Sequence, residues 1–264
     1  MNIAELTKGV YTNGSNELTS RIKIAIDEVE DNQEVLEIGV GFGELSKNIH
    51  RFKKVRLSAV DIAQSPLENV RKYTVDSQLA DISSVPLKFP DNRFDVVFCL
   101  EVFEHLQNPN FALSEIQRVL KPRGKLVLSI PNYLGGHLMI YPGLITPKFF
   151  KYFLEQNYFK VSRFLMWGPV LNKDNIGTLL RFKFGNGIMT SIVLRTVQIS
   201  VRLLQMFTKI LFLKLPALYW CYFFICENRK GEMDSPVWVR QWEQTSQLKG
   251  DLGWYNHYFH RKPR

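Results

Sequence analysis

Short apolar runs alternate with segments of helical periodicity along most of the chain. The early runs are apolar at successive positions, which is typical of strands buried on both faces of a sheet. Between them, apolar residues recur at intervals of three and four, as in helices that pack on such a sheet. Strands are expected at 34–38, 55–60, 77–80, within 89–101, 125–130, 158–167 and 178–184, and helices at 16–31, 44–52, 66–74, 108–120 and 146–156.

This alternation predicts the fold class. Strands that follow one another through helices pair in parallel, and the helices then cover both faces of the sheet. We therefore expect a doubly wound α/β domain with a seven-stranded, mostly parallel sheet in residues 1–187, of which 1–15 form an arm or lid.

Beyond this predicted domain, a long apolar segment carries a narrow basic stripe. Arg195, Arg202 and Lys209 are seven residues apart and therefore fall on one side of a helix. A shorter aromatic run follows, and neither piece has the roughly 20 uncharged residues of a bilayer span. We expect a C-terminal helical appendage at 188–230, followed by an aromatic and basic tail at 231–264.

The net charge of +9 is concentrated in the second half of the chain. Residues 1–136 contain 16 Lys and Arg against 18 Asp and Glu, a net charge of −2, whereas 137–264 contain 18 against 7, a net charge of +11. This asymmetry indicates an anionic partner for the second half. We expect contact with an anionic membrane surface through 188–226, and the alternative is that these helices pack on the domain or in a dimer.

Other features of composition limit the function classes. The three cysteines, Cys99, Cys221 and Cys226, have no metal-ligand spacing, so we expect neither a metal site nor a disulfide framework. The tail contains no RNA-binding signature, so nucleic acid is not the expected partner. The first residues lack the apolar core of a signal peptide, so we expect a cytoplasmic protein with peripheral attachment to the inner face of a membrane. The oligomeric state stays open.

The predicted chemistry begins at the first strand, in the stretch 35–46. Gly39, Gly41 and Gly43 follow this strand and lead into a helix, so the backbone can turn sharply and let a ligand approach. Dinucleotide loops have glycines at relative positions one, three and six, whereas here the third is at position five. The carboxylate of Glu37 suits a cationic amino group better than a pyrophosphate.

Asp61 ends the second predicted strand, about 20 residues beyond the glycines. Doubly wound folds place an acid there to bind the ribose hydroxyls of an adenosine ligand. A solvated Asp at a strand end is the alternative reading of the same residue. Because the glycine loop precedes it, we favour the ligand-binding reading.

Several motifs together resemble those of class I S-adenosylmethionine (SAM)-dependent methyltransferases. They are the glycine loop, the strand at 94–97, the Glu-His-Leu sequence at 104–106 and the turn at 120–125. The resemblance implies SAM as the cofactor, with Asp81 on the adenine amine and the backbone amide of Ile82 on the adenine ring. The residues expected to bind SAM are Glu37, Gly39, Gly41, Asp61, Ile62, Asp81, Ile82 and Leu100.

The resemblance also implies methyl transfer, for which a catalytic base is optional. The donor brings its own leaving group, so the protein mainly aligns the acceptor and excludes water. If the acceptor is a hydroxyl or an acidic carbon, Glu101, His105 and His137 are the candidate bases by sequence position. We expect methyl transfer to a small or lipid-linked amphipathic acceptor at a membrane surface.

Three other functions stay open at this point. One is the same reaction on a soluble metabolite or a nucleic acid, and another is SAM binding without turnover. The third, a nicotinamide-dependent oxidoreductase, is weakest because the glycine spacing differs and the only Tyr-x-x-x-Lys sequence, at 258–262, lies in the tail. The resemblance leaves the acceptor and its reacting atom unspecified.

Overall fold

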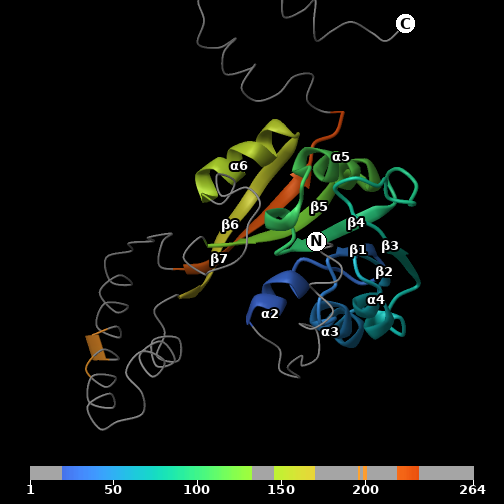
Figure 1. The fold of residues 1–264 in the computed structure, drawn as a ribbon, viewed down its shortest axis with the longest axis horizontal. Coiled ribbons are helices and arrows are strands. Elements are labelled where there is room, and N and C mark those ends of the chain that lie inside the picture. The colour runs from blue at the N-terminus through green and yellow to red at the C-terminus, as the bar shows by residue number, and fades with distance from the viewer. Residues whose placement is uncertain (1–19, 133–145, 170–195, 197–198, 201–218, 232–264) are drawn as a thin grey trace, which may run out of the picture.

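Seven strands form one sheet in the structure, which is a computed structural model (Figure 1). It describes residues 20–132, 146–169, 196, 199–200 and 219–231. The strand order is β3-β2-β1-β4-β5-β7-β6. The strands are β1 (Glu34–Ile38), β2 (Arg56–Asp61), β3 (Asp76–Leu79), β4 (Phe94–Leu100), β5 (Leu120–Pro131), β6 (Phe159–Pro169) and β7 (Tyr219–Asn228).

The sheet is mostly parallel, as the sequence predicts. β1 pairs in parallel with β2 and β4, β2 pairs with β3, and β4 pairs with β5. Only β7 is antiparallel, and it lies between β5 and β6. The predicted doubly wound fold class with seven strands is therefore confirmed.

Helices cover both faces of the sheet, with α2, α3 and α4 on one face and α5 and α6 on the other (Figure 1). Asn108 caps α5 and Thr146 caps α6. The side chain of each accepts a hydrogen bond from the backbone N–H three residues further along, and a proline directly follows each cap. These signals explain where the two helices begin. The helices are α2 (Ser20–Ile26), α3 (Glu44–Phe52), α4 (Gln64–Val70), the 3₁₀ helix η1 (Phe103–His105), α5 (Pro109–Val119) and α6 (Pro147–Gln156).

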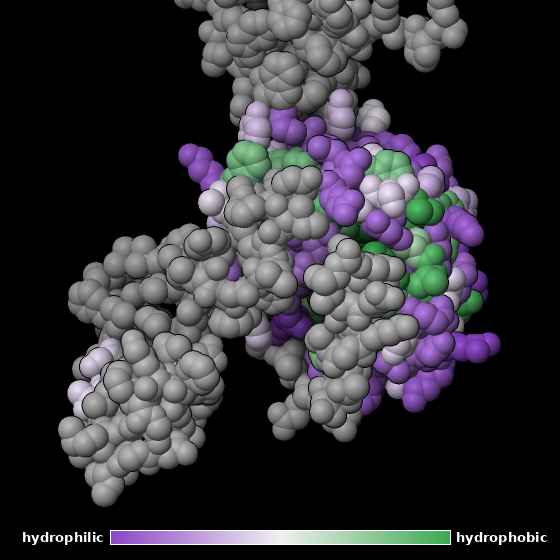
Figure 2. Space-filling view, in the orientation of Figure 1, coloured by the Kyte–Doolittle hydropathy of each residue, from purple (hydrophilic) through white to green (hydrophobic). Residues whose placement is uncertain are grey.

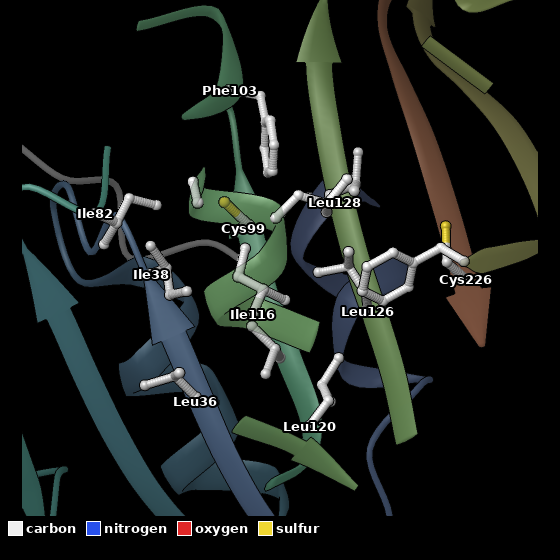
Figure 3. Close-up of a cluster of buried hydrophobic side chains, with 14 of the residues drawn as sticks. Leu36, Ile38, Ile82, Cys99, Phe103, Ile116, Leu120, Leu126, Leu128 and Cys226 are labelled. Carbon is white, nitrogen blue, oxygen red and sulfur yellow. The ribbon is translucent and has the colours of Figure 1, made fainter. Parts of the chain in front are cut away.

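The core consists of apolar side chains on both sides of the central strands. In β1, Leu36 and Ile38 pack beneath α5, whereas Val35 packs toward α2 and α3. Figure 3 shows the first of these layers, in which Leu36 and Ile38 lie with Cys99 of β4 and Ile116 of α5. Burial on both faces explains why the central strands read as continuous apolar runs.

The predicted helical appendage at 188–230 is wrong for its last part, because residues 219–228 form strand β7. Residues 221–226 are buried on successive positions, as expected for a strand with covered faces, and this pattern does not distinguish a strand from a buried helix. The domain therefore does not end at residue 187. The predicted strand at 178–184, the arm at 1–15, the stripe at 188–215 and the tail from residue 232 lie outside the described residues.

The candidate membrane spans can be tested only within the described part of the chain. There, no helix combines the length and the apolarity that are needed to cross a bilayer.

Because β7 lies inside the sheet, we expect substitution of Phe224 on this strand to lower the stability of the fold strongly. Its ring is fully buried, and its centroid lies 5.2 Å from those of both Phe150 on α6 and Phe164 on β6. We expect Phe224→Ala to lower the free energy of unfolding by about 3–5 kcal/mol, measured by chemical denaturation. Phe164→Ala is the matched control, because Phe164 is 39% exposed and its loss leaves a smaller cavity. Equal losses for the two variants would argue against a buried strand at this position.

Candidate active site

The loop after β1 turns because it contains glycine. Gly39 has a φ of 77°, and its N–H donates to the carbonyl of Val60 in β2. A Cβ at Gly39 would lie 2.3 Å from Cγ2 of Val102, which follows β4. Only glycine fits here without displacing Val102, so the loop lies directly against the segment that begins η1.

The Asp61 carboxylate fixes the glycine loop from the end of β2. Its Oδ2 accepts from the N–H of Val40 at 2.8 Å and of Gly41 at 3.5 Å, and its Oδ1 accepts from the N–H of Ala63 at 2.9 Å. Burial raises the pKa of Asp61, and these backbone N–H groups oppose the rise. The carboxylate therefore joins the carboxyl ends of β1 and β2.

Glu37 is a buried carboxyl next to this loop. Its side chain accepts a hydrogen bond from the hydroxyl of Ser46 on α3. Burial raises the pKa of Glu37 to about 8, and the nearby charge of Asp61 adds to the rise. Glu37 is therefore mostly protonated at neutral pH. A cation placed beside it would favour the ionised form.

Asp81 lies at the same edge of the sheet, just beyond β3. The N–H of the preceding Ala80 donates to the backbone carbonyl of Asp61 at 2.9 Å. Burial raises the pKa of Asp81, but hydrogen bonds from Ser83 and Ser84 outweigh it and hold the pKa below its ordinary value. Asp81 is thus ionised at neutral pH.

The structure therefore brings most of the predicted SAM-binding residues to one edge of the sheet. Ile38 is in register with Val60, and Asp61 with Leu79, so β1, β2 and β3 end side by side. Ile62 and Leu100, both half-buried, lie at the ends of β2 and β4. Ile82 contributes its side chain to the core beneath the site (Figure 3).

Two of the three candidate bases can be located. Glu101 follows β4 with a φ of 55° and forms an ion pair with Arg21 of α2, with Nη1 and Oε1 2.8 Å apart. The same guanidinium lies 5.9 Å from the ring centroid of Trp167 on β6. His105 is 44% exposed, and His137 lies outside the described residues. Glu101 is therefore engaged with a cation in this structure.

Glu104 on η1 is a candidate that the sequence reasoning missed. Its side chain is 1% exposed, and neither carboxyl oxygen accepts a hydrogen bond from another described residue. Burial raises the pKa of Glu104 to about 8, and the charge of Glu101 adds to the rise. One ionisable neighbour is His105, whose Nε2 lies 3.8 Å from Oε1 of Glu104. A buried carboxyl that accepts no hydrogen bond from another residue is costly, which makes Glu104 a candidate for a functional role. In the sequence, the one signal for Glu104 was that it lies three residues after Glu101, which was already a candidate base.

These residues fit the expected cofactor. The glycine loop has no room for a Cβ at Gly39, and a protonatable carboxyl, Glu37, lies beside it for an amino group. Asp61 and Asp81 are carboxylate acceptors at the ends of the next two strands, where the expected ribose hydroxyls and adenine amine need them. Within the described ranges, no group of three His, Cys, Asp or Glu residues could hold a metal ion.

Comparison with known proteins supports this interpretation. Residues 36–128 match the family model described as a methyltransferase domain. The ubiquinone biosynthesis O-methyltransferase of Rickettsia bellii (strain OSU 85-389) is 27% identical over 154 residues, which cover 57% of this chain and 62% of that protein. The match thus spans less than two thirds of this relative.

Solved structures share the fold at low sequence identity. The cyclase SpnF has a TM-score of 0.54 at 15% identity, covering 83% of this chain and 85% of its own. Coclaurine N-methyltransferase bound to N-methylheliamine and S-adenosylhomocysteine has a TM-score of 0.50 at 18% identity, covering 83% and 76%. The family match contains the glycine loop, Asp61, Asp81 and η1. Residues 36–128 therefore match a methyltransferase domain, in agreement with the resemblance to class I, SAM-dependent methyltransferases.

Proposed function

We propose that this protein transfers the methyl group of SAM to a hydroxyl of a small or lipid-linked amphipathic acceptor. The observation that carries the proposal is the buried carboxyl of Glu104 on η1, whose oxygens accept no hydrogen bond from another described residue. With a pKa raised to about 8, it can accept a proton near neutral pH. The similarity to a protein named as an O-methyltransferase supports oxygen as the reacting atom.

The donor half of the site consists of three carboxyls and the glycine loop. We assign Glu37 to the amino group of SAM, Asp61 to the ribose hydroxyls and Asp81 to the adenine amine. When bound, SAM supplies a methyl group on a positively charged sulfur that leaves as a neutral thioether. Glu37 is poised to ionise when a cation binds, because burial holds it protonated in its absence.

The acceptor half is formed by η1, the end of β4 and the end of β6. Glu104 takes the proton from the acceptor hydroxyl as the oxygen becomes a nucleophile. Val102, which directly precedes η1, lies against Gly39 of the donor loop. The ion pair of Arg21 with Glu101 and the ring of Trp167 provide a wall that orients the acceptor and excludes water.

An amphipathic acceptor agrees with the charge distribution. The second half of the chain carries a net charge of +11 from 18 Lys and Arg and 7 Asp and Glu, which favours approach to an anionic membrane surface. We propose that the protein is cytoplasmic and binds the membrane peripherally. Strand β7 occupies part of the segment first assigned to membrane contact, so only 188–218 is kept for that role.

Transfer of labelled methyl groups tests the proposal. The full chain is incubated with SAM carrying a radiolabelled methyl group and with membrane lipids or cytosolic metabolites. We expect label in a lipid-extractable product whose methyl group is attached to oxygen. SAM binding without label in any fraction would instead indicate a SAM-binding protein without methyl transfer.

If Asp61 binds the ribose of SAM, substitution of Asp61 should lower the affinity for SAM, and substitution of an exposed aspartate elsewhere should not. Asp61→Asn keeps the shape of the side chain but removes the charge that accepts from the ribose hydroxyls and the loop amides. We expect the dissociation constant for SAM, measured by calorimetry, to rise at least about tenfold. Asp27→Asn, at an exposed position after α2, is the control and should bind as the parent does. Unchanged affinity in Asp61→Asn would remove Asp61 from the site.

Glu37 predicts that SAM affinity depends on pH. Because the pKa of Glu37 is raised to about 8, SAM must drive the loss of its proton at neutral pH. Affinity should therefore increase by up to about tenfold per pH unit as the pH rises toward 8, and level off as the amino group of SAM loses its own proton. Calorimetry in buffers of different ionisation enthalpy should detect one released proton, which Glu37→Gln abolishes. Equal proton release in this variant would contradict the assignment.

If Glu104 is the base, its substitution should lower the rate of methyl transfer and leave the affinity for SAM unchanged. Glu104→Gln should lower kcat by about 10²–10⁴ and leave SAM binding unchanged, because the amide cannot accept the hydroxyl proton. The rate of the parent should rise with pH up to about 8, where Glu104 ionises, and this rise should be absent in the variant. The control is Glu68→Gln, at an exposed position on α4. Parental rates for Glu104→Gln would eliminate it as the base.

A further inference from the structure

Helix α6 exposes aromatic side chains on its outer face. Phe149 is 49% exposed and Tyr152 is 46% exposed, whereas Phe150 and Leu154 on the opposite side are buried in the core. Two exposed lysines, Lys148 and Lys151, lie on the same helix. Figure 2 shows hydrophobic residues in green beside hydrophilic residues in purple where Figure 1 places α6. An outer helix face of a soluble domain is normally polar, so these aromatic residues need another explanation.

The exposed aromatic residues lie at the catalytic edge of the sheet. β5 and β6 both pair antiparallel with β7 and are therefore parallel to each other, so α6 between them runs back from the carboxyl edge. Its first turns, which carry Phe149 and Tyr152, are thus at the edge where β1, β2 and β4 end. Ring contacts support this placement, because the ring centroids of Phe150 and Phe153 on α6 lie 5.7 and 6.5 Å from that of Phe103 on η1.

We propose that Lys148, Phe149, Lys151 and Tyr152 dock on the surface of an anionic lipid bilayer. We call these four residues the α6 face. Aromatic rings and lysines together are typical of helices at the membrane interface, where the rings enter the headgroup region and the cations meet anionic lipid. Phe164 on the neighbouring strand β6, 39% exposed, extends the apolar area. Docking there places the first turn of α6, at the carboxyl edge, on the lipid surface, and its relevance to the acceptor rests on the proposed methyl transfer to an amphipathic acceptor.

Charge favours lipid over a second copy of this chain. A symmetric dimer through the α6 face would bring the lysines of one copy against those of the other. Lys151 forms an ion pair with Glu155, with the charged atoms 3.7 Å apart, so Lys148, Lys151 and Glu155 leave helix α6 with a net charge of +1. An anionic bilayer meets the same two cations with opposite charge.

Sedimentation with vesicles tests the docking. The full chain is mixed with phosphatidylcholine vesicles that contain or lack phosphatidylglycerol, and the bound fraction is measured. We expect binding to the anionic vesicles, weakened at high salt, and at least about tenfold weaker partitioning for Phe149→Ser with Tyr152→Ser. The matched control is Val75→Ser with Leu79→Ser, since both are 55% exposed near β3 at the far edge of the sheet. This control should bind as the parent does.

Charge reversal provides a second comparison. Lys148→Glu with Lys151→Glu should lose binding to the anionic vesicles, whereas Lys54→Glu with Lys88→Glu, which changes the same charge at exposed positions elsewhere, should keep most of it. Absence of binding by the parent, equal losses in target and control variants, or formation of a dimer that the aromatic substitutions dissolve would overturn the proposal.

Turnover separates this proposal from the proposed function. The aromatic double variant should methylate a water-soluble catechol as the parent does and be slower only with an acceptor presented in anionic vesicles. If the parent methylates neither acceptor but binds vesicles through the α6 face, the proposed function fails and the docking surface stands. If both proteins methylate the vesicle acceptor equally, the docking surface fails alone.

Discussion

The contact between Val102 and Gly39 holds the two halves of the site together. No Cβ fits between them, since one at Gly39 would lie 2.3 Å from the valine methyl group. Gly39 begins the loop that we assign to the donor, and Val102 begins the turn that carries Glu104. The glycine loop and the start of η1 are thus in direct contact. The parallel sheet makes this contact by pairing β1 with β4.

Two buried carboxyls give the site its electrostatic character. Burial raises the pKa of both Glu37 and Glu104 to about 8, so each can hold or release a proton near neutral pH. Such groups destabilise a fold, because their ionised forms are poorly solvated. The apolar layers on both faces of the central strands offset that cost. The arrangement places two carboxyls that can hold or release a proton at the proposed site, next to the Asp61 carboxylate that fixes the glycine loop.

Local sequence patterns were sufficient for the parallel part of the fold and for bringing the predicted SAM-binding carboxyls to one edge of the sheet. Glu37, Asp61 and Asp81 follow or end successive strands, and parallel strands bring their carboxyl ends to one edge. The strand β7 could not be found in this way. Its pairing with β5 joins residues 90 to 102 positions apart, from Pro131 with Cys221 to Lys125 with Glu227, and no local periodicity indicates such pairing.

Glu104 was missed for a related reason. Its sequence neighbours show a carboxyl next to a histidine, but its burial depends on tertiary packing, in which Phe103 of η1 lies against Phe150 of α6. The start of β5 was also misjudged, because the turn residues Pro122 and Gly124 lie within the strand, where Arg123 adopts a φ of 63°. Such features arise from tertiary packing and override local preferences.

A crystal structure with S-adenosylhomocysteine would test most directly whether the two halves form one site. We predict that the amino group of the ligand lies beside Glu37, the ribose beside Asp61 and the adenine beside Asp81, with the sulfur facing Glu104 across the Gly39 loop. A ligand bound in another cavity, or a sulfur turned away from Glu104, would contradict this central claim.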